Sequence, residues 1–326
     1  MFRRQAEHFA LLGSPVYAQL ARQLAEDPAP LAPILHGDTS LFVLALFGAV
    51  HYHVITGAAP NALSGDWDDF TDALAEHQES LRRFVEEQGV QTNETQRCVA
   101  LVPAFLTLAG ETRLPLDLIE LGPSAGLNLV FDRYRYRYAE GTFGDPSALL
   151  SFDANERGRV PGDLLRTSLT IGSRCGIDLS PLDAADEDDV TLLHSFLWPG
   201  LTGRAARLDA AIETFRGSPS RPELLRGDYV DLLPALLARR SADALTVVFQ
   251  TASTGYLSQD RYDALCASLE AAAADGRPLA WVSPRRREEK EFEDDSFWEL
   301  ELHVWPAPAR LVALADFHGN WIDWLG

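Results

Sequence analysis

One stretch constrains the fold more than any other, residues 116–138, LDLIELGPSAGLNLVFDRYRYRY. A short apolar run is followed by the turn Gly122-Pro123-Ser124-Ala125-Gly126, after which apolar residues recur at helical spacing. This order predicts a strand, a tight glycine loop and a helix. Free N–H groups at such a helix start bind ligands, and glycines let a ligand approach the backbone closely. The stretch is therefore a candidate small-molecule site.

Composition limits the partners and the cell compartment. The chain has 326 residues, of which 46% are apolar, so it can bury a large core. Its net charge of −20 argues against nucleic acid or an anionic membrane as the main partner. The three cysteines form no CxxC pair, and the N-terminus lacks the apolar core of a signal peptide. We expect a cytoplasmic protein without disulfides.

The chain divides into a helical part and an α/β part. Residues 1–113 are predicted to form a helical lobe, because apolar residues recur there at helical spacing between prolines. The most apolar run, residues 41–55, is short for a membrane span and is predicted to be a buried helix. It carries His51 and His53, which are two residues apart and so share no helix face; no metal site is predicted.

From residue 114 to residue 326, short apolar runs alternate with amphipathic segments, which predicts a Rossmann-like α/β domain with a mostly parallel sheet. Strict alternation over residues 298–305, then a turn into residues 311–317, predicts an added antiparallel hairpin. Residues 141–171 are expected to form an inserted loop or hairpin, and residues 285–295 a solvated charged loop. The predicted strands are 116–121, 174–179, 223–226, 245–250 and 278–282; the predicted helices are 127–133, 187–196, 204–215, 230–239 and 260–273.

Polar residues stand at the ends of four successive predicted strands. They are Glu120 with Gly122 and Gly126, then Asp178, Asp228 and Gln250. A nucleotide-type cofactor binds beyond the carboxyl ends of such strands, where an acidic residue accepts from ribose hydroxyls. If the insertion contained the true second strand, Asp153 would replace Asp178.

The segment QTNETQR, residues 91–97, precedes the first strand and has two interpretations. In one, Asn93 caps a helix and Gln96 completes a capping box. In the other, Asn93, Glu94 and Arg97 overhang the cofactor loop. Asn128, in the first turns after the loop, is expected to hydrogen-bond the loop or a ligand, because Asn is a mediocre helix former.

Two resemblances follow from these motifs. E-x-G-x-x-x-G and GIDLSP resemble the first two motifs of class I S-adenosylmethionine-dependent methyltransferases, and the terminal hairpin is similar to that fold. More closely, QTNETQRC, ELGPSAGLNL, DRYRYRY, GIDLSPLD, LWP, RGD and the late HG resemble the uncharacterised bacterial domain-of-unknown-function family 2332 over nearly the whole chain. That family has no established activity.

The methyltransferase resemblance implies S-adenosylmethionine as cofactor and a small-molecule acceptor. It implies that Gly122 and Gly126 face the methionine part, Asp178 the ribose and Asp228 the adenine edge. Ser124 stands where many methyltransferases have a middle glycine.

A base is needed to deprotonate the acceptor, and His318 and Glu94 are the candidates.

Other activities remain open. The same fold can serve a non-catalytic nucleotide-binding or interaction protein. GPSAG also matches G-x-S-x-G, in which Ser124 would be a hydrolase nucleophile, with His318 as base and Asp243 or Asp260 as acid. The helical chain before the loop disfavours the hydrolase. A nicotinamide dehydrogenase is disfavoured by the missing middle glycine.

Overall fold

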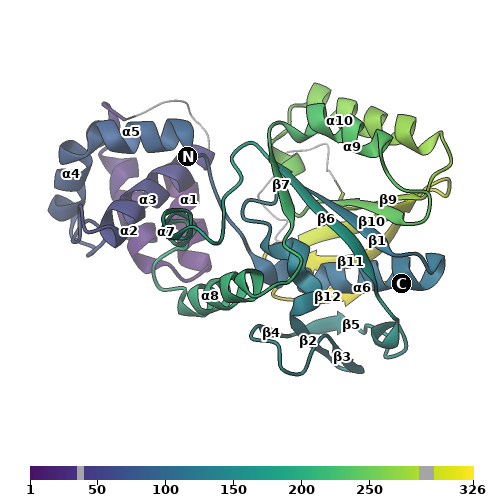
Figure 1. Cartoon of the computed structure of the whole chain (residues 1–326). Helices are drawn as coiled ribbons and strands as arrows, with labels where there is room; N and C mark the ends of the chain where they lie inside the picture. The colour runs from purple at the N-terminus through teal and green to yellow at the C-terminus, as the bar shows by residue number, and fades with distance from the viewer. Residues whose placement is uncertain (35–39, 286–296) are drawn as a thin grey trace. The chain divides into compact units, whose positions relative to one another are not determined.

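The computed structural model describes residues 1–34, 40–285 and 297–326 (Figure 1). The charged run 286–295 thus lies outside the described residues. The chain forms two compact units, residues 1–92 with 183–209, and residues 93–182 with 210–326. This division differs from the predicted boundary at residues 113 and 114, because one further helix belongs with the sheet and residues 183–209 return to the first unit.

The first unit is helical. Its helices are α1 (Phe2–Leu11), α2 (Pro15–Glu26), the 3₁₀ helix η1 (Ala29–Leu31), α3 (Ser40–Ile55), α4 (Trp67–Glu76), α5 (Gln78–Glu87) and α7 (Glu187–Ser195). Phe9, Tyr17 and Phe47 are buried at its centre, and the Tyr17 hydroxyl donates to the Phe47 carbonyl at 3.0 Å. Helix α3 therefore is the predicted buried helix. No helix of the described residues is long and apolar enough to cross a membrane.

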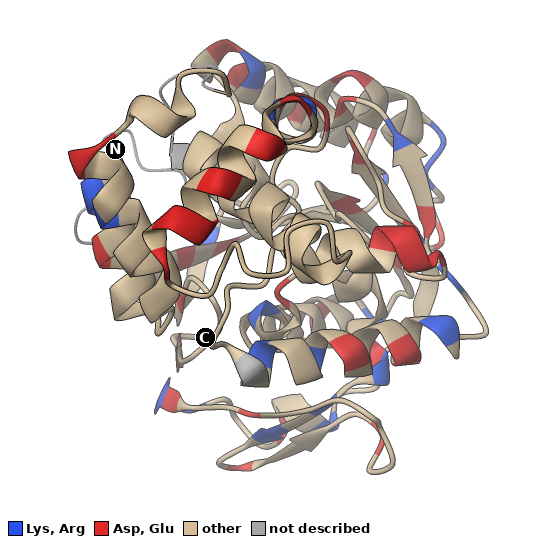
Figure 2. Cartoon of the chain, turned by 90° about the vertical axis from the view of Figure 1, so that its left-hand side faces the viewer, with Lys and Arg blue, Asp and Glu red and all other residues tan. Residues whose placement is uncertain are grey.

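Aspartates cap two helices of this unit. Asp66 accepts from the first N–H groups of α4, and Asp186 does the same for α7. Further acidic residues follow in the first turn of each helix. Figure 2 shows that Asp and Glu residues occur on many helices of the chain. Negative charge at a helix N-terminus is stabilised by the free N–H groups and the helix dipole. Part of the acidic excess of the chain thus has a structural role.

The second unit contains a nine-stranded sheet in the order β5-β12-β11-β10-β9-β8-β1-β6-β7. The parallel part of this sheet consists of β9, β8, β1, β6 and β7. Strand β10 is antiparallel to both of its neighbours, β9 and β11. The fold class is therefore the predicted one, a mainly parallel sheet with a terminal antiparallel hairpin. The strands are β1 (Leu116–Leu121), β5 (Glu156–Gly158), β6 (Ile171–Asp178), β7 (Glu223–Arg226), β8 (Leu245–Phe249), β9 (Leu279–Pro284), β10 (Phe297–Val304), β11 (Arg310–Asp316) and β12 (Ile322–Trp324).

Helices cover both faces of this sheet. Helices α9 (Tyr229–Ala238) and α10 (Gln259–Ala273) bury Leu233 and Leu265 in one cluster with Ile119 of β1. Helix α6 (Cys98–Thr112) covers the other face, where the ring centroids of Phe105 and Phe249 of β8 are 5.2 Å apart. Helix α8 (Thr202–Arg216) begins in the first unit and ends in the second. Because side chains alternate along β1, Glu120 lies on the face opposite Ile119.

The insertion is more ordered than predicted. Strands β2 (Arg135–Tyr138), β3 (Gly141–Phe143) and β4 (Ser151–Asp153) form a separate three-stranded sheet, and β5 joins the main sheet beside β12. Leu127–Arg133 is a 3₁₀ helix, η3, and Leu164–Arg166 is another, η4. Asp153 pairs with Arg137 in the small sheet. The alternative that Asp153 ends the second strand is therefore wrong, since Asp178 ends β6, the neighbour of β1.

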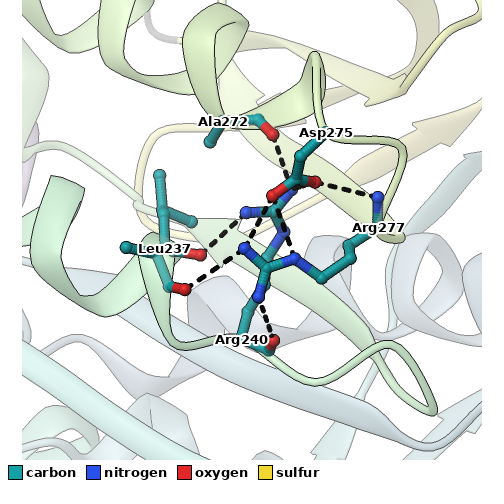
Figure 3. Close-up of polar contacts among 6 residues, drawn as sticks. Leu237, Arg240, Ala272, Asp275 and Arg277 are labelled. Atoms are coloured by element: carbon teal, nitrogen blue, oxygen red, sulfur yellow. Dashed lines mark hydrogen bonds and ion pairs between the residues drawn. The ribbon is translucent and has the colours of Figure 1, made fainter.

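A pair of arginines closes the C-terminal ends of α9 and α10 (Figure 3). Arg240 donates to the carbonyls of Leu237 at 2.7 Å and Ala272 at 2.6 Å, and it also bonds Asp275. Arg277 donates to Asp275 and to the Arg240 carbonyl at 2.7 Å. The last carbonyls of a helix lack helical partners, so these guanidinium groups satisfy them.

Candidate functional site

The order of the strands reverses between β1 and β8. From β1 the chain adds β6 and β7 on one side, then returns to place β8 on the other side of β1. Ligands of open α/β sheets bind beyond the carboxyl ends of the strands at such a point. The loop Gly122–Gly126 leaves β1 there, so the topology places it where a ligand is expected.

The backbone of this loop requires its glycines. Gly122, Ser124 and Gly126 have φ angles of 70°, 54° and 72°, in the left-handed region. A side chain at Gly122 would place its Cβ 2.5 Å from the Cβ of Ser253, in the segment after β8. Ser124 adopts this conformation despite its Cβ, which costs backbone energy. The loop is thus held in one shape by its conformation and by its neighbour.

The amide groups of the loop are engaged inside the protein. Gly122 N–H donates to the Ile177 carbonyl at 2.9 Å, and Gly126 N–H donates to the Pro123 carbonyl at 2.9 Å. Ser124 N–H donates to the Asp178 Oδ2 at 2.9 Å. A loop that binds phosphate offers its amides to the phosphate oxygens. These three amides are not available for that purpose.

Acceptor atoms without partners surround the loop instead. Among the described residues, Glu120 Oε2, Ser124 Oγ and Asn93 Oδ1 have no hydrogen-bond partner. Glu120 is 1% exposed and Ser124 is 6% exposed, so water does not readily solvate them. Buried polar atoms are normally hydrogen-bonded, and an orphaned one requires an explanation. Each of these three atoms could accept a hydrogen bond from a bound ligand.

Glu120 occupies the most buried position of the site. Its Oε1 accepts from Asn128 Nδ2 at 3.1 Å, and Asn128 Oδ1 accepts from the Cys98 thiol at 3.4 Å. Burial raises the pKa of Glu120 to about 8, and the charge of Asp178 acts in the same direction. The Asn128 hydrogen bond and the positive charge of Arg97 oppose this rise in pKa. Asn128 hydrogen-bonds beneath the loop, as one interpretation predicted.

Residues 93–97 connect the loops at this edge of the sheet. Asn93 Nδ2 donates to the Pro123 carbonyl at 2.7 Å. Gln96 Nε2 donates to the Gly319 carbonyl at 3.1 Å, in the turn after β11. Arg97 donates to the Phe317 carbonyl and to Thr251 Oγ1, both at 3.1 Å.

The capping-box interpretation of this segment is wrong. Glu94, not Asn93, caps the 3₁₀ helix η2 (Thr95–Arg97) and accepts from Gln96 N–H at 3.1 Å. Asn93 does not cap this helix, and its side-chain nitrogen is bonded to the glycine loop instead. The segment does lie against that loop, and its ligand role stays a prediction.

Two other predicted site residues are engaged in internal contacts. Gln250 is fully buried, where its Nε2 donates to Thr254 Oγ1 at 3.0 Å and its Oε1 accepts from Trp281 at 3.3 Å. Asp228 caps α9 and forms an ion pair with Arg261 at 2.6 Å. Both residues end or follow strands as predicted, and both have structural roles there.

The described residues show no contact between a nucleophile and a base for the hydrolase alternative. Ser124 Oγ contacts no base among the described residues, although the loop has the strained φ of a nucleophile turn. His318 lies in the turn after β11, at the carboxyl edge, where its N–H donates to Asp316 at 2.9 Å. Asp243 precedes β8 and so lies at the opposite edge, too far to serve His318 as the acid. In the described residues, Ser124 is thus a residue of the glycine loop without a catalytic partner.

Sequence reasoning missed Cys98, Ser253 and Gly319 at this site. Ser253 Oγ donates to the Leu121 carbonyl at 2.6 Å and packs on Gly122. A Cβ at Gly319 would lie 2.3 Å from the Gln96 carbonyl oxygen. The contact of Gly319 had one signal in the sequence, the late His318-Gly319 pair. Its partner, Gln96, could not be predicted from sequence spacing.

A surface hollow lies at the other edge of the sheet. It is lined by Ala109, Gly110, Arg113, Leu114, Pro115, Thr167, Ser168 and Thr170, next to the start of β1. It contains none of the predicted site residues. In the part of the chain that the structure describes, no group of three or more His, Cys, Asp or Glu side chains is arranged to hold a metal ion.

Comparisons with known proteins define the family and little else. The family model described as "Uncharacterized protein conserved in bacteria (DUF2332)" matches residues 1–324. Among solved structures, the chain is similar to one described as "DhpI-SAM-HEP complex", with 12% identity, a TM-score of 0.24 and coverage of 80% of this chain and 79% of that chain. That TM-score is too low to support an argument about function. The curated proteins gave no match.

Proposed function

The chain belongs to the bacterial family of uncharacterised proteins DUF2332, and we propose that it binds S-adenosylmethionine at the glycine loop and transfers the methyl group to a small molecule. The observation that carries this proposal is the chemistry of the loop. The amides of Gly122, Ser124 and Gly126 are used internally. By contrast, Glu120 Oε2, Ser124 Oγ and Asn93 Oδ1 lack a hydrogen-bond partner among the described residues.

This set of atoms fits a cationic ligand better than a phosphate. An ammonium group has three N–H donors and no acceptor. The amino-acid part of S-adenosylmethionine carries such a group beside a positive sulfonium. A dinucleotide or a nucleoside triphosphate would instead require free amides or basic side chains for its phosphates. The acceptor-rich loop therefore supports an adenosyl amino acid over these ligands.

Asp178 fits the ribose. Its Oδ2 accepts from Ser124 N–H and its Oδ1 accepts from Ser180 N–H, both at 2.9 Å. Each carboxylate oxygen has a second lone pair that can accept a hydroxyl. Leu179, the next residue, is 70% exposed, which provides an apolar surface for a flat base beside the carboxylate.

When bound, the cofactor supplies an electrophilic methyl group. The residues of the chain would hold the donor, exclude water and take the proton of the acceptor. His318 and Glu94 are the proposed bases, and both belong to the loops that residues 93–97 join. The acceptor is proposed to be a small molecule, and the protein is proposed to work in the cytoplasm without nucleic acid or membrane partners.

A second candidate is a binding protein of the same fold without turnover. The internal contacts of Gln250 and Asp228 favour it, because they remove two predicted ligand groups from the site. Binding of the cofactor without methyl transfer to any acceptor in a broad screen would support this second candidate.

Isothermal titration calorimetry tests the binding step. We expect S-adenosylmethionine and S-adenosylhomocysteine to bind, and ATP and NAD⁺ to bind at least tenfold more weakly. Asp178→Asn should weaken binding of both adenosyl ligands. Asp163→Asn is the matched control, since Asp163 is exposed and its side chain makes no cap hydrogen bond. Equal binding by the two variants would contradict the proposed role of Asp178.

A further inference from the structure

Glu120 is a carboxyl group in an environment that does not support its charge. It is 1% exposed, and its Oε2 has no hydrogen-bond partner among the described residues. One oxygen, Oε1, accepts a single hydrogen bond from Asn128 at 3.1 Å. An ionised carboxylate in the interior needs a counter-ion and several hydrogen bonds to be stable.

The groups that face Glu120 come from several elements. Asp178 at the end of β6 is acidic and disfavours a second negative charge. Arg97 of η2 favours the charge, and its guanidinium also donates to the Phe317 carbonyl and to Thr251 Oγ1. Cys98 of α6 and Tyr134 after η3 are neutral groups whose own pKa values are raised by burial and by Glu120. The balance keeps a proton on Glu120, whose pKa is about 8.

We infer that Glu120 is protonated in the ligand-free protein and that a cationic ligand amino group displaces this proton when it binds at the glycine loop. The inference rests on the proposed function, since it assigns Glu120 to the ammonium of that ligand. The reaction is balanced: the carboxyl O–H bond breaks, the proton goes to the buffer, and the ligand ammonium becomes the counter-ion of the carboxylate. Glu120 then selects for ligands that carry a positive amino group, and it makes their affinity depend on pH.

The test is calorimetry in two buffers of different ionisation enthalpy, phosphate and Tris, at pH values between 6 and 7.5. The ligand S-adenosylhomocysteine has the amino group, and 5′-methylthioadenosine lacks the whole amino-acid part. We expect S-adenosylhomocysteine to release about nine-tenths of a proton at pH 7, given a Glu120 pKa of about 8. Its affinity should rise about tenfold from pH 6 to pH 7, whereas 5′-methylthioadenosine should release no proton.

Two variants identify the source of the proton. Glu120→Gln should bind S-adenosylhomocysteine more weakly and release no proton. Asp163→Asn, at an exposed residue outside the site, should leave the proton release unchanged. The infrared carbonyl band of a protonated carboxyl group should be present in the ligand-free wild type and disappear when the ligand is added. This band needs no variant, so it decides the matter even if Glu120→Gln does not fold.

The outcomes separate this inference from the proposed function. Failure of both ligands to bind at every pH would overturn the proposed function and the inference with it. Binding of S-adenosylhomocysteine without proton release, with an affinity constant from pH 6 to pH 7.5, would overturn the inference alone. Proton release that persists in Glu120→Gln would also overturn it.

Discussion

Ser124 N–H donates a 2.9 Å hydrogen bond to Asp178 Oδ2, which joins the loop after β1 to the end of β6 across 54 residues of sequence. The same carboxylate accepts from Ser180 N–H, so Asp178 fixes its own loop as well. An acidic residue at this position therefore shapes the site in addition to any contact with a ligand.

Asp178→Ala should destabilise the second unit. Two backbone N–H groups lose their acceptor, and each such loss costs about 1–3 kcal/mol where the group is buried. Urea denaturation of Asp178→Ala and Asp163→Ala measures the cost, with the exposed Asp163 as control. A midpoint equal to that of the wild type would contradict the role of Asp178 in holding the loop.

Gly122→Ala should be costly for a specific reason. The added Cβ would lie 2.5 Å from Ser253 Cβ, and the φ of 70° disfavours a side chain. We expect a loss of about 2–4 kcal/mol in the free energy of unfolding. In a Ser253→Gly background the collision disappears, so the cost of Gly122→Ala should fall to about 1 kcal/mol, the part due to φ. Equal costs in both backgrounds would show that Ser253 does not restrict the loop.

Glu120 should make stability depend on pH. Its folded pKa of about 8 lies above the ordinary value of 4.5, so between these values the folded state binds a proton that the unfolded state lacks. Stability should therefore fall as the pH rises from about 5 to 8, by up to about 1.4 kcal/mol per pH unit, and this loss should end above pH 8. Denaturation curves of the wild type and Glu120→Gln at each pH isolate the effect. Parallel pH profiles of the two proteins would contradict it.

Arg240→Met should lower stability without affecting the site. The change removes donors from the carbonyls of Leu237 and Ala272 at the ends of α9 and α10 (Figure 3). These helix ends precede β8 and β9, whereas the glycine loop follows β1, so they lie at the opposite edge of the sheet. We expect a loss of about 1–3 kcal/mol, with ligand affinity unchanged at temperatures where the variant is folded. Arg239→Met is the control, because Arg239 is exposed and makes one such bond, at 3.2 Å. Equal losses in the two variants would contradict the role given to Arg240.

The sequence predicted the parts of the fold that depend on local pattern. The apolar runs that became β1, β6, β7, β8 and β9 placed Glu120, Asp178 and Asp228 at the ends of their strands, because strand length and apolar period are local properties. Strands β5 and β12 were missed, since each has three residues and gains its stability from the partner strand.

The contacts that close the site were beyond prediction for a different reason. The Asn93 bond to Pro123 and the Gln96 bond to Gly319 join residues 30 and 223 positions apart. An Asn before a helix is a good cap in any local view, so only the tertiary contact shows that its side chain is used elsewhere. The pairing of residues 183–209 with the N-terminal helices likewise depends on packing, such as the Phe196 ring against Gly48.

The proposed function requires the glycine loop to bind an adenosyl ligand with a positive amino group. Calorimetric titration of the full chain with S-adenosylhomocysteine at pH 7.5, beside ATP under the same conditions, tests it most directly. We expect one binding site for S-adenosylhomocysteine, weakened in Asp178→Asn and unchanged in Asp163→Asn. No heat of binding with S-adenosylhomocysteine or S-adenosylmethionine, or tighter binding of ATP than of either, would contradict it.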